Sequence, residues 1–288
     1  MIQPDVAEPP FILVTNDDGI HSPGLHAAVK AVCDLGEIMV AAPRQQQTGA
    51  SRSYPPVHDK AIYPEEIPVN CRTVTAYGFE ASPAQAVMAA LLDLAPRPPN
   101  LLISGINFGE NLGTSVTTSG TVGAAIEAAS FGVPALAVSV ETPKEFHYQH
   151  SDTVDFTAAA AFTRRFAQIV LAGGLPPDVD ILKIEVPSDA SPDTAWRIAR
   201  VSRQRYYVPL PSGRRSLSDQ KGIDYTRVIN WDVLEADSDV RAVAVDRVVS
   251  VSPISIDLTA RVDLDELAAD LQRRDPHKLE QLNIQNNR

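Results

Sequence analysis

Short apolar runs that alternate with helical patterns constrain the fold of this 288-residue chain more than any other feature. The runs are rich in Val, Ile and Leu, which is typical of strands buried on both faces. Their alternation with helices predicts an α/β fold with a mainly parallel sheet covered by helices on both faces. The expected strands are 11–16, 37–43, 101–105, 134–140 and 181–186, and the expected helices are 23–35, 82–94, 121–131 and 152–172.

Two regions depart from this alternation. Residues 54–78 carry four prolines among short β-type stretches and predict an irregular, hairpin-like excursion. From residue 188 onward, prolines, arginines and short β-like runs dominate, and a final helix is expected over 263–273. We therefore expect an α/β core over 1–187 and a β-rich C-terminal extension over 188–288, which could lie on the same molecule or reach toward a partner.

Charge and composition exclude several classes of function. The net charge of −11 disfavours binding of long nucleic acids, because the chain would be repelled by their phosphates. No apolar run approaches the roughly 20 residues that span a bilayer. The N-terminal sequence MIQPDVAEPP has no signal-peptide pattern, so we expect a cytoplasmic protein without a membrane partner. Neither Cys33 nor Cys71 lies in a C-x-x-C pair, so neither a zinc cage nor a disulfide framework is predicted, and Cys33 is expected as a buried small hydrophobe in a helix.

Polar side chains follow the first three core strands. Asp17 and Asp18 follow the first strand, Thr48 follows the second and Asn107 follows the third. In an open parallel sheet these strand ends lie at one edge, where ligands bind. Carboxylate, hydroxyl and amide oxygens suit Mg²⁺, Mn²⁺ or Ca²⁺, and a divalent cation would offset the repulsion between the two aspartates.

A simple turn is the alternative for Asp-Asp-Gly, since both residue types tolerate left-handed backbone. Two charges directly after a buried strand are costly unless they are paired, however. No lysine lies within ten residues of the two aspartates in the sequence. The pair therefore favours a cation site over a turn alone.

The glycine-rich segment Ser104–Ala125 contains Ser119-Gly120-Thr121 where a helix is expected to begin. Free amides at a helix N-terminus, with hydroxyls beside them, form a phosphate-sized anion site. The segment matches neither the Walker pattern nor G-x-G-x-x-G, and a plain capped helix with a glycine hinge is the alternative. Opposite an oxygen-ligand metal, this anion site would suit the hydrolysis of a phosphate monoester.

Several motifs carry a resemblance to a known family. They are NDDGIHSPGL, AAP followed by TGAS, SGINFGENLG and SGTVGAAIEAASFGVPALAVS, with weaker matches in ILKIEVP and VVSVSPISIDLTA. In this combination and order the chain resembles the survival protein SurE family, which are metal-dependent phosphatases acting on nucleoside monophosphates. The resemblance implies a Rossmann-like three-layer catalytic core over 1–187, a C-terminal extension over 188–288 that serves oligomerisation, and one divalent metal ion per subunit. It also implies a homodimer or homotetramer in which the C-terminal β segment is exchanged or extended between subunits.

The resemblance also places functional residues on this chain. The family's metal ligands fall on Asp17, Asp18, Thr48 and Asn107, and its phosphate-binding loop falls on Asn111, Ser119, Gly120 and Thr121. Three stretches depart from the family's pattern. Thr48 replaces a serine and Arg44 replaces an acidic residue near the expected site mouth. In addition, 81–86 lacks the usual acid, and Ser115 and Thr118 replace a frequent acid and tyrosine. Substrate range is therefore the property that transfers least.

The leading hypothesis is a divalent-metal-dependent phosphomonoesterase that hydrolyses nucleoside 5′- and 3′-monophosphates, and short polyphosphate, with metal-activated water. Asp17 or Asp18 would orient or deprotonate that water. His21 is either a proton donor or a loop cap. Around 203–207, arginines and tyrosines could contact a base or a partner subunit, or form a solvated strand face.

Two rival classes remain. The first is a non-catalytic nucleotide-binding or regulatory protein on the same scaffold, which the altered loop positions would allow. The second is a Rossmann dehydrogenase. That class is disfavoured because Asn16-Asp17-Asp18-Gly19 puts negative charge where a pyrophosphate would bind.

Overall fold

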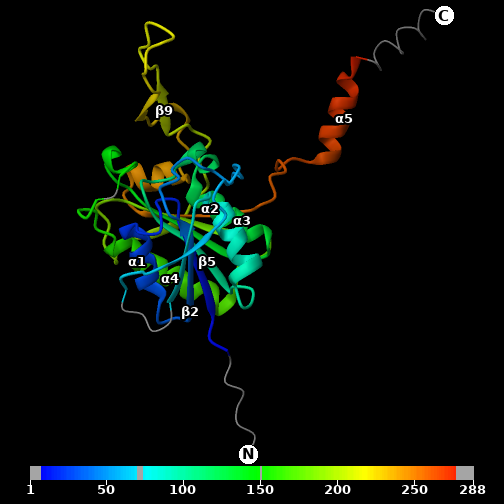
Figure 1. The fold of residues 1–288 in the computed structure, drawn as a ribbon. Helices are drawn as coiled ribbons and strands as arrows, with labels where there is room; N and C mark the ends of the chain where they lie inside the picture. Colours follow the sequence, from blue (N-terminus) through cyan, green and yellow to red (C-terminus); the bar gives the residue numbers. More distant parts are fainter. Residues whose placement is uncertain (1–7, 70–73, 150, 277–288) are drawn as a thin grey trace, which may run out of the picture. The chain divides into compact units, whose positions relative to one another are not determined.

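The computed structural model describes residues 8–69, 74–149 and 151–276. Its main sheet has the strand order β3-β4-β2-β1-β5-β6-β7-β11-β8, and β9 and β10 form a second, two-stranded sheet. Figure 1 shows β2 and β5 of the main sheet and β9 of the second sheet. The strands are β1 (Phe11–Thr15), β2 (Glu37–Pro43), β3 (Ile62–Glu65), β4 (Val74–Phe79), β5 (Leu101–Phe108), β6 (Ala135–Val140), β7 (Ile181–Val186), β8 (Trp196–Ile198), β9 (Tyr207–Leu210), β10 (Asp224–Arg227) and β11 (Val249–Ile254).

The α-helices are α1 (Pro23–Val32), α2 (Pro83–Ala89), α3 (Gly120–Ser130), α4 (Thr157–Gly173) and α5 (Leu264–Arg274). Short helical turns are η1 (Ala90–Leu94), η2 (Gly113–Thr117), η3 (Lys144–Phe146), η4 (Trp231–Val233) and η5 (Arg241–Val245). Local signals place the helix starts. Pro23 and Pro83 occupy first-turn positions, where a missing N–H costs nothing, and Ser82 forms a capping box with Gln85.

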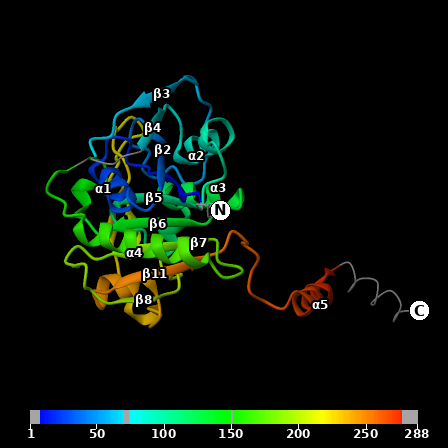
Figure 2. The same ribbon diagram turned by 90° about the horizontal axis from the view of Figure 1, so that it is seen from below.

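Two helix layers cover the sheet, as Figure 2 shows. Helices α1 and α4 pack on one face around a core that includes Leu25 and Phe162. Helices α2 and α3 pack on the other face around Val87 and Val122. Strands β1, β2, β5, β6 and β7 are nearly fully buried, which explains their continuous apolar sequence. The predicted α/β fold with a mainly parallel sheet is confirmed.

The topological switch point of the sheet lies between β1 and β5. From β1 the chain adds β2 and β4 on one side, then returns to add β5, β6 and β7 on the other, all in parallel register. The carboxyl ends of β1, β2 and β5 are therefore neighbours. This is the crevice where open α/β sheets bind ligands.

Strand β5 is longer than the sequence predicted, running to Phe108 instead of ending at Gly105. Its register against β6 shifts between Ser104 and Asn107, and the Gly105–Ile106 peptide bond is cis. A register shift of this kind re-aims the side chains that follow it. Asn107 is thus presented by an irregular strand end and not by a loop.

Strands β8 and β11, from the segment predicted as an extension, lie in the main sheet. Strand β11 pairs antiparallel with β7 and parallel with β8. Residues up to Ile256 form one compact unit, and the segment from Asp257 forms a second unit that contains α5. The division at residue 187 stays a prediction.

Cys33 differs from its expected role as a buried hydrophobe. It lies half-buried at the C-cap of α1 and is disulfide-bonded. The expectation of no disulfide is therefore wrong for Cys33, while Cys71 lies outside the described residues. Within the described ranges, no helix combines the length and apolarity needed to cross a bilayer.

Candidate active site

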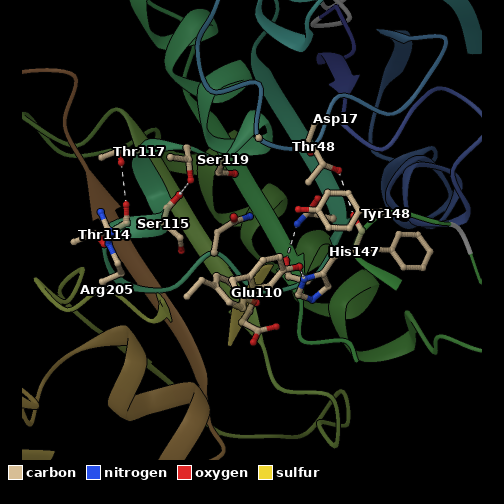
Figure 3. Close-up of a pocket in the computed structure, with 18 of the residues that line it drawn as sticks. Asp17, Thr48, Glu110, Thr114, Ser115, Thr117, Ser119, His147, Tyr148 and Arg205 are labelled. Atoms are coloured by element: carbon tan, nitrogen blue, oxygen red, sulfur yellow. Dashed lines mark hydrogen bonds between the residues drawn. The ribbon is translucent and has the colours of Figure 1, made fainter. Parts of the chain in front are cut away.

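A cavity of about 380 Å³ opens at the carboxyl edge of the sheet. Five of the residues singled out from the sequence line it: Asp17, Thr48, Asn107, Asn111 and Ser119. They come from the ends of β1, β2 and β5 and from the cap of α3. Figure 3 shows Asp17 and Thr48 at one end of this cavity, Thr114 and Arg205 at the other end, and Ser119 between them.

Asp17 is almost completely buried and is held by the N-terminus of α3. The Thr121 hydroxyl donates to its Oδ1 at 2.6 Å. Burial raises the pKa of Asp17 to about 6, although the Thr121 hydroxyl and the nearby amides of Thr121 and Gly120 lower it in part. A Cβ at Gly120 would lie 2.6 Å from Asp17 Oδ2, so only glycine allows this close approach.

Asp18 is also almost completely buried, and it is not among the residues that line the cavity. The Phe108 amide donates to its Oδ2 at 3.0 Å, and the Gln46 side chain donates to its Oδ1 at 3.1 Å. Burial, followed by repulsion from Asp17, raises the pKa of Asp18 well above its usual value. Two buried carboxyls with raised pKa values are a destabilised pair, and positive charge between them would stabilise both ionised forms.

The loop that carries Thr48 is fixed against α3 and η3. The Thr48 hydroxyl donates to the His147 carbonyl at 3.3 Å, and the Ser51 hydroxyl donates to the Thr117 carbonyl at 2.9 Å. Arg52 donates to the buried Glu127 carboxylate of α3 at 2.7 Å. These bonds make the loop part of the cavity wall.

Ser119 caps α3 by accepting a bond from the Val122 amide at 3.1 Å, and its side chain also lines the cavity. Gly120 and Thr121 are not among the cavity-lining residues, because both face Asp17. The α3 N-terminus therefore sits directly behind Asp17, and its positive partial charge acts on that carboxylate.

The donor set fits a hard divalent cation. Asp17, Thr48 and Asn107 supply carboxylate, hydroxyl and amide oxygens at the carboxyl ends of three neighbouring strands on one cavity wall, and Asp18 is next to Asp17 in the sequence. No group of three or more His, Cys, Asp or Glu residues within the described part of the chain has metal-binding geometry. A site here would thus use two carboxylates with neutral oxygen ligands, which is typical of Mg²⁺ or Mn²⁺ and not of zinc.

Sequence reasoning missed the parts of the cavity lining that follow η3 and that lie on the β9–β10 hairpin. His147 and Tyr148 follow η3 and lie beside Thr48 (Figure 3), and Tyr207, Pro209 and Tyr225 belong to the hairpin. The His147 and Tyr225 rings are stacked with centroids 6.1 Å apart, and the Tyr225 hydroxyl bonds with His147 Nδ1 at 2.8 Å. The aromatic sequence around 206–207 was the available signal, but it allowed several interpretations.

Arg205 and Glu110 also line the cavity. Arg205 is the sole Lys or Arg side chain among the described lining residues, and it is exposed. Burial raises the pKa of Glu110 to about 7, although Arg227 lies 2.9 Å from its Oε1 and lowers it in part. The cavity thus offers one exposed cation for an anionic ligand.

Two other positions noted in the sequence lie outside the cavity lining. His21 lies 3.5 Å from Glu65 and is exposed. Arg44 pairs with Glu65 at 3.2 Å and with Glu80 at 3.1 Å, so its charge is offset by β3 and by the residue that follows β4. The cation that faces the cavity is Arg205, which comes from a different part of the chain.

A doubly wound sheet with carboxylate, hydroxyl and amide groups gathered at its switch point defines a Rossmann-like α/β protein with a polar ligand cavity. The family can be stated more narrowly. Residues 12–208 match the family model described as survival protein SurE, and the chain belongs to this family.

Relatives support the assignment over almost the whole chain. A protein of Thermococcus gammatolerans named 5′-nucleotidase SurE is 42% identical over 261 residues, which cover 89% of this chain and 94% of that protein. A protein of Methanothrix thermoacetophila with the same name is 41% identical over 264 residues, covering 89% and 96% of the two chains. The crystal structure of the SurE protein from Aquifex aeolicus superposes with a TM-score of 0.68 at 27% identity, covering 87% of this chain and 95% of that one.

Proposed function

We propose that this protein is a divalent-metal-dependent nucleotidase that hydrolyses the phosphate monoester of nucleoside 5′-monophosphates, and also 3′-monophosphates and short polyphosphate. The observation that carries the proposal is the convergence of Asp17, Thr48 and Asn107 on one wall of a single polar cavity, with Asp18 beside them. The 5′-nucleotidase names of close relatives support the same reaction class.

One Mg²⁺ or Mn²⁺ ion per subunit would be held by Asp17, Asp18, Thr48 and Asn107. When bound, such an ion polarises a phosphoryl oxygen and lowers the pKa of water. The protein's own part is to hold these ligands in place. The Phe108 amide and Gln46 fix Asp18, and Thr121 fixes Asp17.

Substrate binding is proposed for the remaining polar groups of the cavity. Asn111 and Ser119 would donate to phosphate oxygens, while the amides of Gly120 and Thr121 keep positive partial charge at that end. Arg205 would add attraction for the substrate's charge from across the cavity. Asp17 is the better candidate to accept a proton from the attacking water, because it lines the cavity and Asp18 does not.

The decisive experiment is phosphate release from a panel of nucleoside 5′- and 3′-monophosphates and tripolyphosphate, with Mg²⁺, with Mn²⁺ and with EDTA. We expect turnover with metal and none with EDTA. Asp17→Asn and Asp18→Asn should each lower turnover by at least about 100-fold, the scale of a lost acid–base group, with the circular dichroism spectrum unchanged.

Asp93→Asn is a matched control, since this aspartate is exposed on η1. Its turnover should equal that of the wild type. Turnover that persists in EDTA would refute the metal mechanism. Binding of the nucleotides without any turnover would instead favour the non-catalytic nucleotide-binding alternative.

Assembly as a homodimer or homotetramer is part of the proposal. The α5 helix leaves Leu264, Leu267 and Leu271 exposed by 59%, 41% and 55% on an otherwise polar helix. Apolar side chains repeated at this spacing form a stripe that a partner surface can bury. Light scattering on the eluted protein should give a mass of two or four chains, and a single-chain mass would contradict this part.

A further inference from the structure

Three charged side chains are completely buried behind the cavity wall. Lys183 and Glu185 lie two residues apart on β7, so they point to the same face of the sheet, and Asp239 comes from the segment before η5. The exposed fraction of each side chain is 0%. We refer to these three residues as the β7 ion cluster.

The cluster is costly to bury, so its role needs an explanation other than stability. Desolvation of ions offsets most of their mutual attraction, and buried ion clusters can often be replaced by apolar residues without loss of stability. Burial alone would lower the pKa of Lys183, but attraction to Asp239 and Glu185 outweighs it and raises that pKa. The lysine is therefore charged, and it holds the two carboxylates together.

Two residues of the cluster bind the backbone of Asn111, which lines the cavity. Lys183 Nζ donates to Asp239 Oδ2 and to the Asn111 carbonyl, both at 2.9 Å. Glu185 Oε2 accepts from the Asn111 amide at 2.8 Å. Both sides of the Asn111 peptide backbone are thus bonded to buried charges.

The Asn111 side chain is bound to the same cluster through Ser139. Asn111 Nδ2 donates to Ser139 Oγ at 3.1 Å, and Ser139 Oγ lies 3.4 Å from Glu185 Oε1. Since Asn111 also lines the cavity, its orientation there is set by Glu185 at two points. A side chain held in this way can present a donor to a ligand without first losing conformational freedom.

Asp239 extends the cluster to the other wall of the cavity. Its Oδ2 accepts from the Gly113 amide at 3.2 Å, and its Oδ1 accepts from the Ser202 amide at 2.9 Å. Gly113 has φ of +56° and packs so closely on Gln204 that a Cβ would lie 2.4 Å from the Gln204 carbonyl oxygen. The segments on either side, which carry Asn111 and Arg205, are therefore joined through one carboxylate.

We propose that the β7 ion cluster is a positioning network that fixes Asn111 for binding the phosphate of the substrate. This inference rests on the proposed function, since it assigns Asn111 to the phosphate. Lys183, Glu185 and Asp239 do not line the cavity and act only through the loop that they hold. Residues that orient a binding group from behind typically change affinity or activity by about 10- to 100-fold when they are lost.

The test is a double-mutant cycle read on the dissociation constant of inorganic phosphate, measured by calorimetry in the presence of Mg²⁺. Glu185→Met should weaken phosphate binding by at least about tenfold in the wild-type background. In the Asn111→Ala background it should change binding by less than about twofold, because the group that Glu185 positions is absent. Glu185→Gln, which keeps an acceptor for the Asn111 amide, should restore binding to near the wild-type value.

A matched control separates positioning from general destabilisation. Thr163 is buried in α4, donates to the Ala159 carbonyl at 2.7 Å and does not line the cavity. Thr163→Ala should lower the melting temperature and leave phosphate binding unchanged. If Glu185→Met does not fold, Ser139→Ala replaces it in the cycle, since it breaks the same connection with a smaller change.

The inference would be overturned if Glu185→Met weakened phosphate binding equally in the wild-type and Asn111→Ala backgrounds. Unchanged phosphate binding in Glu185→Met or in Ser139→Ala would also overturn it. Absence of phosphate binding by the wild type would overturn it as well. The proposed function is judged separately by turnover, because the phosphate cycle can be read on an enzyme that hydrolyses nothing. If the wild type shows no turnover but the double-mutant cycle gives the expected result, the nucleotidase proposal is refuted and the positioning network is supported.

Discussion

The close approach of Gly120 to Asp17 predicts that one added methyl group at position 120 will impair catalysis. In Gly120→Ala the added Cβ would lie 2.6 Å from Asp17 Oδ2 and 2.7 Å from Asp17 Cβ. Carbon atoms pack at about 3.5–4.0 Å, so the Asp17 side chain must retreat by about 1 Å or the first turn of α3 must shift by that amount. Either movement displaces a carboxylate that we place at the metal.

The expected effect on catalysis is large relative to the effect on stability. A displacement of about 1 Å of a positioned group can cost about 100-fold in rate, which corresponds to about 2.7 kcal/mol in the activation barrier. Overpacking lowers the unfolding free energy by about 1–3 kcal/mol. Replacing glycine by alanine offsets about 0.4–1 kcal/mol of this loss, because it reduces the conformational entropy of the unfolded chain. We therefore expect kcat/KM for a nucleoside monophosphate to fall about 100-fold in a protein that is still folded at 25 °C.

Gly173→Ala is the matched control. Gly173 ends α4, and a Cβ there would have no neighbour within 4 Å. This variant should keep wild-type kcat/KM and gain up to about 1 kcal/mol of stability. Phosphate release gives kcat/KM for the two variants, and urea unfolding gives their stability, so the two effects are measured separately. A Gly120→Ala enzyme within twofold of the wild type would refute the reasoning that Asp17 must be held in place.

Two further predictions concern charges near the cavity. Burial raises the pKa of Glu110 to about 7, so the folded protein prefers the protonated form, and stability should fall as the pH rises from about 4.5 to about 7. The expected decline in unfolding free energy between pH 4.5 and pH 8 is no more than about 3 kcal/mol, and Glu110→Gln should remove it. Urea unfolding at the two pH values measures this, and an equal decline in the wild type and the variant would contradict the prediction. Arg52→Ala should leave the buried Glu127 without its cation and lower the unfolding free energy by about 1–3 kcal/mol. Adding Glu127→Gln should recover part of that loss, and an additive loss in the double variant would rule out this pairing.

The convergence of the ligand set could be predicted from sequence because it follows from topology. Once β1, β2 and β5 are taken as neighbouring parallel strands, their carboxyl ends must meet, and the polar residues Asp17, Thr48 and Asn107 come with them. The motif resemblance supplied the same residues independently. What remained open was orientation, and the structure directs Thr121 to Asp17 instead of to the cavity.

Contacts between distant segments could not be predicted from one sequence. The Lys183–Asp239 pair spans 56 positions, and the β9–β10 hairpin reaches the cavity only through the fold of the whole C-terminal half. No local periodicity encodes either contact. The disulfide at Cys33 could not be predicted either, since the spacing of two cysteines in a sequence carries no signal for their pairing.

The position of β11 near the end of the sequence has a consequence for folding during synthesis. Strand β7 is paired on one side by β6 and on the other by β11, whose residues lie more than sixty positions further along the chain. A ribosome must therefore finish most of the polypeptide before this edge is closed, and Asp239 emerges only shortly before β11. Until then one flank of β7 has no pairing partner, and an unpaired strand edge is open to wrong pairing and aggregation.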